Sequence, residues 1–205
     1  MGHLYKDVEL YLDQLTPTDT SVFVEIGSDK GNGSTLPLAG MAQSKGLRLI
    51  TVDLEEGVGG RLQYRYPDDP RLTNIDCVCA QGSVWAKDLF PSLGLSIACL
   101  YLDNFDWDYG DPQWNQTIIE QQQEYAKRGF EMTNYNSQIE HLAQMVALLP
   151  YMDDTSIITC DDTYTSGYNC WVGKCGAVVP YLRIHGYNII RKDESAVMLA
   201  RNIRG

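Results

Sequence analysis

Basic side chains and long apolar runs are both scarce in this sequence. Lysine and arginine number 16 against 27 aspartates and glutamates, so the formal net charge is −11 and the pI is about 4.6. Because binding to nucleic acid or to an anionic membrane needs a basic face, this balance argues against both kinds of partner. No apolar run approaches the roughly 18 residues of a membrane span, and the start, M-G-H-L-Y-K-D, lacks the apolar core of a signal peptide. We therefore expect a cytoplasmic protein.

Cysteine pairs at metal-binding spacing are missing as well. None of the six cysteines forms a C-x-x-C motif, and three of them lie in apolar, strand-like runs. We expect reduced, mostly buried thiols rather than a zinc site or a disulfide framework. The 205 residues, 44% of them hydrophobic, suffice for one domain with its own core. We predict a single domain over 1–205, with an N-terminal helix within 1–20 and an insertion over 106–136.

The clearest pattern is the stretch 22–33, V-F-V-E-I-G-S-D-K-G-N-G. Its apolar, β-branched start predicts a buried strand, and its glycines precede a helix-compatible segment at 34–44. Such glycines let the backbone approach a ligand closely, and the N–H groups of a helix start attract anions. The spacing Glu25-x-Gly27-x-x-x-Gly31-x-Gly33 differs from the G-x-G-x-x-G of dinucleotide sites, which disfavours a nicotinamide oxidoreductase. The stretch predicts a small-molecule site, with an ordinary strand-to-helix turn as the alternative.

Acidic residues end several of the predicted strands. Asp53 closes the second strand, about 20 residues after the glycines, where a carboxylate suits a ribose diol; an N-cap or a solvated turn is the alternative. Asp103 ends the fourth strand and Asp161-Asp162 follow the fifth, so we expect all three in one crevice. Adjacent carboxylates need a positive group between them, and three hard oxygens suit Mg²⁺. Apolar patterns predict strands at 47–54, within 72–81 (I-D-C-V-C-A), and at 95–105, 156–160, 187–191 and 195–201. They predict helices at 3–15, 114–127, 137–149 and 177–185.

The glycine stretch resembles motif I of the class I S-adenosylmethionine-dependent methyltransferases. The segments L-Y-L-D-N-F-D, I-I-T-C-D-D-T-Y and G-A-V-V-P-Y-L-R-I-H-G-Y-N-I-I-R-K-D-E-S-A-V-M-L-A-R are similar, in order and spacing, to metal-dependent O-methyltransferases of the catechol and bacterial sugar or macrolide type. The similarity covers about 22–201. It implies an α/β, doubly wound Rossmann-like fold whose seven-stranded, mostly parallel sheet ends in a C-terminal antiparallel hairpin.

The resemblance also implies ligands and residue roles. A divalent cation, Mg²⁺ or similar, would be held by Asp103, Asp161 and Asp162, and would orient and acidify an acceptor hydroxyl. Asp103 and Asp106 are the catalytic candidates; Asp106 is the candidate base, in a place where the catechol-type enzymes carry a lysine. His141 is the alternative base, although such a histidine is more often structural. The cofactor S-adenosylmethionine would be bound by Glu25, Gly27, Ser28, Gly31, Gly33, Ser34, Asp53, Leu54, Gly82, Ser83 and Asp103.

Three departures from the family pattern leave alternatives open. Gly33 replaces a serine, Ser83 stands where an acid is usual, and the stretch between 105 and 137 is long. That stretch is either a surface helix or homodimer contact, or a lid with aromatic walls at Trp107, Tyr109 and Trp114. Tyr164, Tyr168 and Trp171 are further pocket candidates. We expect Mg²⁺-assisted O-methyl transfer to a small hydroxylated acceptor such as a sugar, polyketide or phenolic diol. The alternatives are a metal-independent methyltransferase and an inactive binding protein of the same fold.

Overall fold

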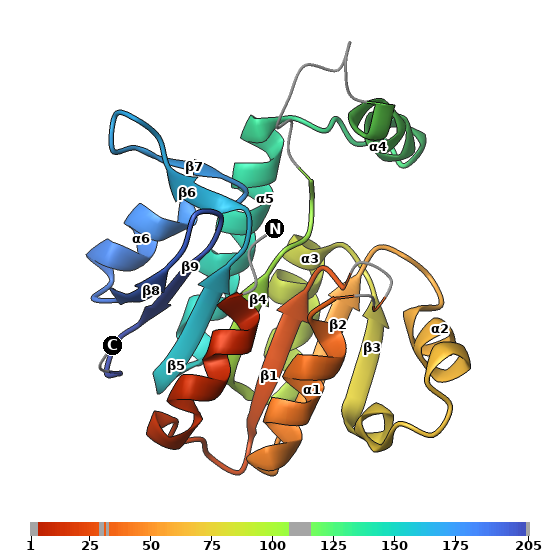
Figure 1. Cartoon of the computed structure of the whole chain (residues 1–205), viewed down its shortest axis with the longest axis vertical. Coiled ribbons are helices and arrows are strands. Elements are labelled where there is room, and N and C mark those ends of the chain that lie inside the picture. Colours follow the sequence, from red (N-terminus) through yellow and green to blue (C-terminus); the bar gives the residue numbers. More distant parts are fainter. Residues whose placement is uncertain (1–3, 29–30, 32, 107–115, 204–205) are drawn as a thin grey trace.

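The computed structural model describes residues 4–28, 31, 33–106 and 116–203. Seven strands form one twisted sheet in the order β3-β2-β1-β4-β5-β9-β8 (Figure 1). The neighbours from β3 to β5 are parallel, whereas β9 runs antiparallel to both β5 and β8. This topology confirms the predicted fold class. The strands are β1 (Ser21–Ile26), β2 (Arg48–Asp53), β3 (Ile75–Cys79), β4 (Ser96–Leu102), β5 (Met152–Cys160), β8 (Asn188–Lys192) and β9 (Val197–Ala200), with a separate hairpin of β6 (Thr163–Thr165) and β7 (Trp171–Gly173).

Helices cover both faces of the sheet. The N-terminal 3-10 helix η1 and α1 lie on one face, and α3 and α5 lie on the other (Figure 1). No helix among the described residues is long and apolar enough to cross a membrane. The helices are η1 (Leu4–Gln14), α1 (Thr35–Ser44), α2 (Val58–Arg65), α3 (Gly82–Val84), α4 (Gln116–Lys127), α5 (Asn134–Leu148) and α6 (Val178–Ile184), with the short turns η3 (Pro70–Asn74), η4 (Trp85–Leu89), η5 (Phe90–Leu93) and η6 (Leu149–Tyr151).

The central strands are buried on both faces, as parallel strands between two helical layers are. Along β1, Val24 belongs to the core cluster that includes Met145 of α5. Its neighbour Phe23 belongs to the opposite cluster, with Val8 of η1 and Leu38 of α1. Successive side chains of a strand point to opposite faces, so one continuous apolar run fills both cores. Because both cores fix these strands, the polar groups at their carboxyl ends are held in defined positions.

Three local features differ from what the sequence suggests. The stretch 56–70 is rich in glycine, proline and aspartate, which is typical of an irregular connection, yet it contains α2, because Val58 and Leu62 pack in a small core with Leu36. The stretch 163–176 has the glycine content of a loop and contains the β6–β7 hairpin. The thiols are all free, as expected, but three of the six are exposed, since β3 is an edge strand and Cys170 lies between the hairpin strands. The edge position of β3 depends on distant strands, and the strands of the β6–β7 hairpin are three residues each, too short for apolar periodicity to report.

Candidate functional site

A cavity of about 500 Å³ opens at the carboxyl edge of the sheet. This is the edge at which open α/β sheets bind ligands, and the volume is that of a typical small-molecule site. The ends of β1, β2 and β4, the turn after β3, and helix α4 all contribute. Its described lining residues are Gly27, Val52, Asp53, Leu54, Glu55, Ala80, Gln81, Gly82, Asp103, Asn104, Phe105, Asp106, Thr117, Glu120, Gln121, Glu124, Tyr125, Arg128, Phe130 and Glu140.

Gly27 begins the turn that follows β1 and has a φ of +97°. A Cβ at this position would lie 2.4 Å from the backbone nitrogen of Asn104, so a side chain has no room. The next residue, Ser28, donates from both its backbone nitrogen and its hydroxyl to Oδ2 of Asp53, each at 2.8 Å. Oδ1 of Asp53 accepts from the backbone nitrogen of Glu55, also at 2.8 Å. The glycine turn therefore fixes the Asp53 carboxylate at the cavity wall.

Glu25 lies beneath this turn, fully buried. Its carboxylate accepts hydrogen bonds from the hydroxyls of Ser34 at 2.5 Å, Thr35 at 2.7 Å and Thr51 at 2.6 Å. Burial raises the pKa of Glu25 to about 7, although the three hydroxyls oppose the increase. Glu25 and Ser34 are thus placed to tie β1, β2 and the start of α1 together behind the ligand cavity. Their assignment as cofactor-binding residues stays a prediction.

The other two glycines of the stretch differ from Gly27. Gly31 has a φ of +79°, and a Cβ there would meet Leu62 of α2 at 2.6 Å. A Cβ at Gly33 would meet open space, and this residue is exposed. The lack of a side chain at Gly31 therefore allows Leu62 of α2 to pack against the turn, whereas a side chain at position 33 would point into open space.

The turn after β3 is held by an acid from another element. A Cβ at Gly82 would lie 2.6 Å from both Ile26 and Gln144, so the backbone packs closely against the end of β1 and against α5. Glu140 of α5 accepts from the nitrogen of Ser83 at 2.9 Å, from its hydroxyl at 2.8 Å, and from the amide of Gln81 at 2.9 Å. The carboxylate that the sequence lacks at 83 is therefore supplied from α5.

The buried face of α5 differs from its apolar periodicity. Ile139 and Val146 belong to the apolar pattern of 137–149, yet both residues are nearly half exposed, at 47% and 48%. The N-terminal half of α5 covers polar strand ends rather than apolar core, which selects a polar face. Its buried residues are Ser137, Glu140, His141, Gln144, Met145 and Leu148. Buried His141 bonds the carbonyl of Ser137 through Nδ1 at 2.7 Å, and burial lowers its pKa to about 4. It is absent from the described cavity lining, which favours a structural role.

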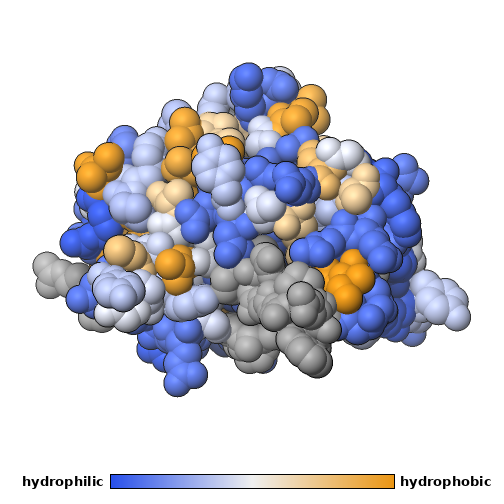
Figure 2. All heavy atoms as spheres, turned by 90° about the horizontal axis from the view of Figure 1, so that it is seen from above, coloured by the Kyte–Doolittle hydropathy of each residue, from blue (hydrophilic) through white to orange (hydrophobic). Residues whose placement is uncertain are grey.

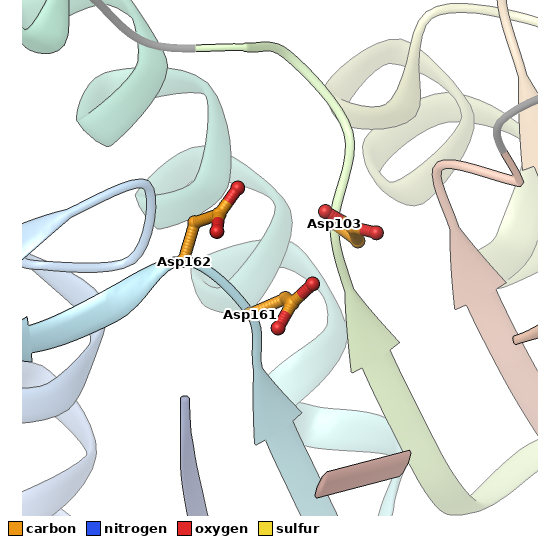
Figure 3. A group of neighbouring side chains, drawn as sticks. All are labelled: Asp103, Asp161 and Asp162. Carbon is orange, nitrogen blue, oxygen red and sulfur yellow. The ribbon is translucent and has the colours of Figure 1, made fainter. Parts of the chain in front are cut away.

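Asp103, Asp161 and Asp162 meet between the ends of β4 and β5 (Figure 3). One ligand oxygen from each lies within 4.8 Å of the others, a grouping that can hold a metal ion. Asp161 is buried, and its Oδ1 has no hydrogen-bond partner among the described residues. Burial raises the pKa of Asp161 to about 7, and the nearby Asp103 and Asp162 carboxylates add to the increase. The predicted metal ligands are brought together; the ion itself stays a prediction.

A lysine that sequence reasoning missed occupies this cluster. The Lys174 Nζ lies 2.7 Å from Oδ1 of Asp103, 3.1 Å from Oδ2 of Asp162 and 3.5 Å from Oδ1 of Asp106. The side chain is 5% exposed. Burial lowers the pKa of Lys174, but the three carboxylates more than offset this, so the pKa is raised well above its usual value. Two of the three predicted ligand oxygens thus already bind an ammonium ion. With Lys174 in this position, the same oxygens cannot also bind a divalent ion. The sequence signal was a lysine between Gly173 and Cys175-Gly176, beyond an acidic pair that needs a cation.

The predicted insertion forms a wall of the cavity. Helix α4 is docked through Tyr125, whose ring packs on Phe105 with centroids 4.8 Å apart and whose hydroxyl accepts from the nitrogen of Asp106 at 2.6 Å. Just beyond α4, Arg128 pairs with Glu55, which follows β2, at 2.7 Å. These contacts join α4 to the ends of β4 and β2. Whether the segment is a lid or a homodimer contact stays a prediction.

Several aromatic candidates lie elsewhere or outside the described residues. Tyr168 is 92% exposed, and neither it, Tyr164 nor Trp171 is among the described residues that line the cavity. The predicted lid residues Trp107, Tyr109 and Trp114 fall outside the described residues.

No family model and no curated protein matches this sequence. Solved structures do match over nearly the whole chain. A candidate rRNA methylase from Clostridium thermocellum superposes with a TM-score of 0.60 at 10% identity, over 98% of each chain. The fold is the methyltransferase fold. CalS11, a TDP-rhamnose 3'-O-methyltransferase of calicheamicin biosynthesis, matches with a TM-score of 0.56 at 13% identity, over 97% of this chain and 78% of that one.

A further match shows the same fold with a ligand in place. TomG from Streptomyces achromogenes, an O-methyltransferase of tomaymycin synthesis solved in complex with S-adenosylmethionine, gives a TM-score of 0.54 at 10% identity, over 98% of this chain and 79% of that one. At such identities the likeness establishes the methyltransferase fold, while the reaction has to be argued from the site.

Proposed function

We propose that this protein transfers the methyl group of S-adenosylmethionine to a hydroxyl group of a small acceptor. One observation carries the proposal. Gly27, Asp53, Gly82 and Asp103, which follow or end four successive parallel strands, line one cavity of about 500 Å³. The resemblance to the methyltransferases assigns the same four residues to the cofactor. Their convergence at the ligand-binding edge of a methyltransferase fold favours that assignment.

The cavity wall has the features that an adenosine-containing cofactor needs. Gly27 and Gly82 both line the cavity, and the Cβ that each lacks would point into the protein, so both turns pack closely behind the cavity wall. Between them, the Asp53 carboxylate is held by Ser28 and by the backbone of Glu55, so it is oriented before any ligand binds. An ionised carboxylate keeps acceptor capacity for hydroxyl donors such as those of a ribose.

For methyl transfer the protein has to position the cofactor and the acceptor and to accept one proton. The bound cofactor supplies a methyl carbon made electrophilic by its sulfonium. In the transfer, the acceptor oxygen forms a bond to that carbon as the carbon–sulfur bond breaks, and the hydroxyl proton passes to a base and then to water. Asp106 is the candidate base: it lines the cavity, with its Oδ2 held by Gln121 at 3.2 Å. Asp103 shares the wall and orients the acceptor.

The charge of the cavity narrows the acceptor class. The described lining includes seven acids and one arginine: Asp53, Glu55, Asp103, Asp106, Glu120, Glu124 and Glu140 against Arg128. Hydrophilic side chains also dominate the face at the carboxyl edge of the sheet, which Figure 2 views from above. An acidic cavity repels phosphate, so a neutral or cationic hydroxylated molecule fits better than a nucleotide-linked one. The same argument, with the net charge of −11, disfavours rRNA as the acceptor.

Calorimetric titration of S-adenosylhomocysteine tests the cofactor assignment. We expect binding to the wild type at a single site, weakened about 10- to 100-fold by Asp53→Ala, because two hydrogen bonds to a charged group are lost. Asp76→Ala is the matched control, since Asp76 is an acid on β3 that pairs with Arg48 away from the cavity. Absence of binding, or equal binding by all three proteins, would contradict the proposal. Binding without turnover of any diol acceptor would favour the inactive binding protein.

A further inference from the structure

The acidic cluster at the ends of β4 and β5 already holds a cation of the chain itself. Lys174 reaches Asp103, Asp162 and Asp106 with its Nζ at 2.7, 3.1 and 3.5 Å, and at 3.3 Å it also donates to the backbone oxygen of Asp103. The lysine comes from the segment after β7, some seventy residues beyond Asp103 in sequence. Its side chain is 5% exposed, so the ammonium ion exchanges water for carboxylate partners.

The backbone is built to deliver this lysine. Gly173 has a φ of +88°, and a Cβ there would lie 1.8 Å from the carbonyl oxygen of Asp162. That same oxygen accepts from the backbone nitrogen of Lys174 at 3.0 Å. Asp162 is itself in the left-handed region, with a φ of 44°. Strain of this kind persists where the surroundings impose it, and it commonly marks functional positions. Here it brings the β7 end against the acidic pair.

The charges point to a cation site rather than an ordinary ion pair. Three carboxylates surround the single ammonium ion, and Asp161 adds a fourth, with an Oδ1 that has no hydrogen-bond partner among the described residues. A buried acid oxygen without a partner, aimed into a group of further acids (Figure 3), is expensive unless positive charge is nearby. Four carboxylates converging at two strand ends form the donor set of a hard divalent ion.

We propose that Lys174 is the resident cation of this site and holds the place that a divalent metal ion would take among Asp103, Asp161 and Asp162. In this arrangement the lysine is a positioning residue. It does not line the cavity among the described residues, but it fixes the Asp103 and Asp106 carboxylates that do. The methyl transfer then proceeds without added metal. The role in transfer rests on the proposed function, whereas the occupancy of the cation site does not.

Binding of Mn²⁺ by the protein alone, followed by the electron paramagnetic resonance signal of the free ion, tests this proposal. We expect no binding to the wild type up to about 1 mM, the weak end of biological cation sites. Lys174→Met keeps the aliphatic stem and removes the charge, and it should bind one Mn²⁺ at least about tenfold more tightly. The gain should vanish in Lys174→Met combined with Asp162→Asn. Lys192→Met is the control, because Lys192 is an exposed lysine over Trp171 of the same hairpin.

Each contrary outcome overturns the proposal. Mn²⁺ bound by the wild type and lost in Asp162→Asn would mean that the lysine gives way to a metal. A folded Lys174→Met protein that binds no Mn²⁺ would mean that the lysine holds no cation site. If this variant does not fold, Lys174→Gln replaces it, because an amide can bond the same carboxylates. The measurement uses neither cofactor nor acceptor, so its failure is distinct from a failure to bind S-adenosylhomocysteine.

Discussion

Replacing Glu25 with glutamine should make the stability of the protein less dependent on pH. Glu25 is fully buried beneath the glycine turn, and burial raises its pKa from 4.5 to about 7. The folded protein therefore holds this proton more tightly than the unfolded chain does. By linkage, the free energy of unfolding falls as the pH rises from the unfolded pKa to the folded pKa, and it levels off above the folded pKa. Each unit of difference between the folded and unfolded pKa corresponds to about 1.4 kcal/mol, so Glu25 lowers the free energy of unfolding by about 3 kcal/mol over this pH range.

Urea unfolding at pH 4.5, 6, 7 and 8 measures this contribution. Glutamine keeps one acceptor oxygen, enough for the hydroxyls of Thr35 and Thr51 or for that of Ser34, and carries no proton to lose. The stability difference between Glu25→Gln and wild type should therefore shift by about 3 kcal/mol in favour of the variant from pH 4.5 to 8. Asp161, whose pKa is also raised, is present in both proteins and cancels in the difference. Glu9→Gln, on the exposed side of η1, controls for the lost charge. Parallel stability curves for Glu25→Gln and wild type would refute the reasoning.

Two further predictions concern the β6–β7 hairpin and the segment of helix α4. Gly173→Ala should lower the free energy of unfolding by about 3 kcal/mol, because the new Cβ would lie 1.8 Å from a backbone oxygen. Gly167→Ala is the control. A Cβ at Gly167 would meet open space, so this variant should change the free energy of unfolding by less than about 0.5 kcal/mol in the same denaturant titration. Arg128→Ala breaks a partly exposed pair with Glu55 and should alter stability by less than about 1 kcal/mol, yet speed S-adenosylhomocysteine release up to about fivefold in stopped-flow measurements. Unchanged release, or equal release from the exposed-pair control Lys127→Ala, would argue against a closing role for Arg128.

The sequence by itself determined the parts of this protein that depend on neighbours along the chain. Apolar runs marked the strands, and the residue that closes each run marked the ligand-binding edge, because a parallel sheet gathers the carboxyl ends of its strands. On that basis Asp53 and Asp103 were expected at the ligand-binding edge and Gly27 in a small-molecule site, and all three line the cavity. The C-terminal hairpin was equally local, since two apolar segments flank a short polar turn.

Only the tertiary structure decided which distant residues complete the site. Glu140 supplies the acid that position 83 lacks, and Lys174 supplies a cation to acids about seventy residues earlier. Glu140 carries no local signal, and Lys174 carries only that of a lysine beyond an acidic pair, because their other partners become neighbours only when α5 and the β6–β7 hairpin pack over the strand ends. The face that α5 buries was misjudged for the same reason: Ile139 is apolar, but that part of the helix meets polar groups. Periodicity along a chain reports that one face is buried, whereas the chemistry of that face is set by what it meets.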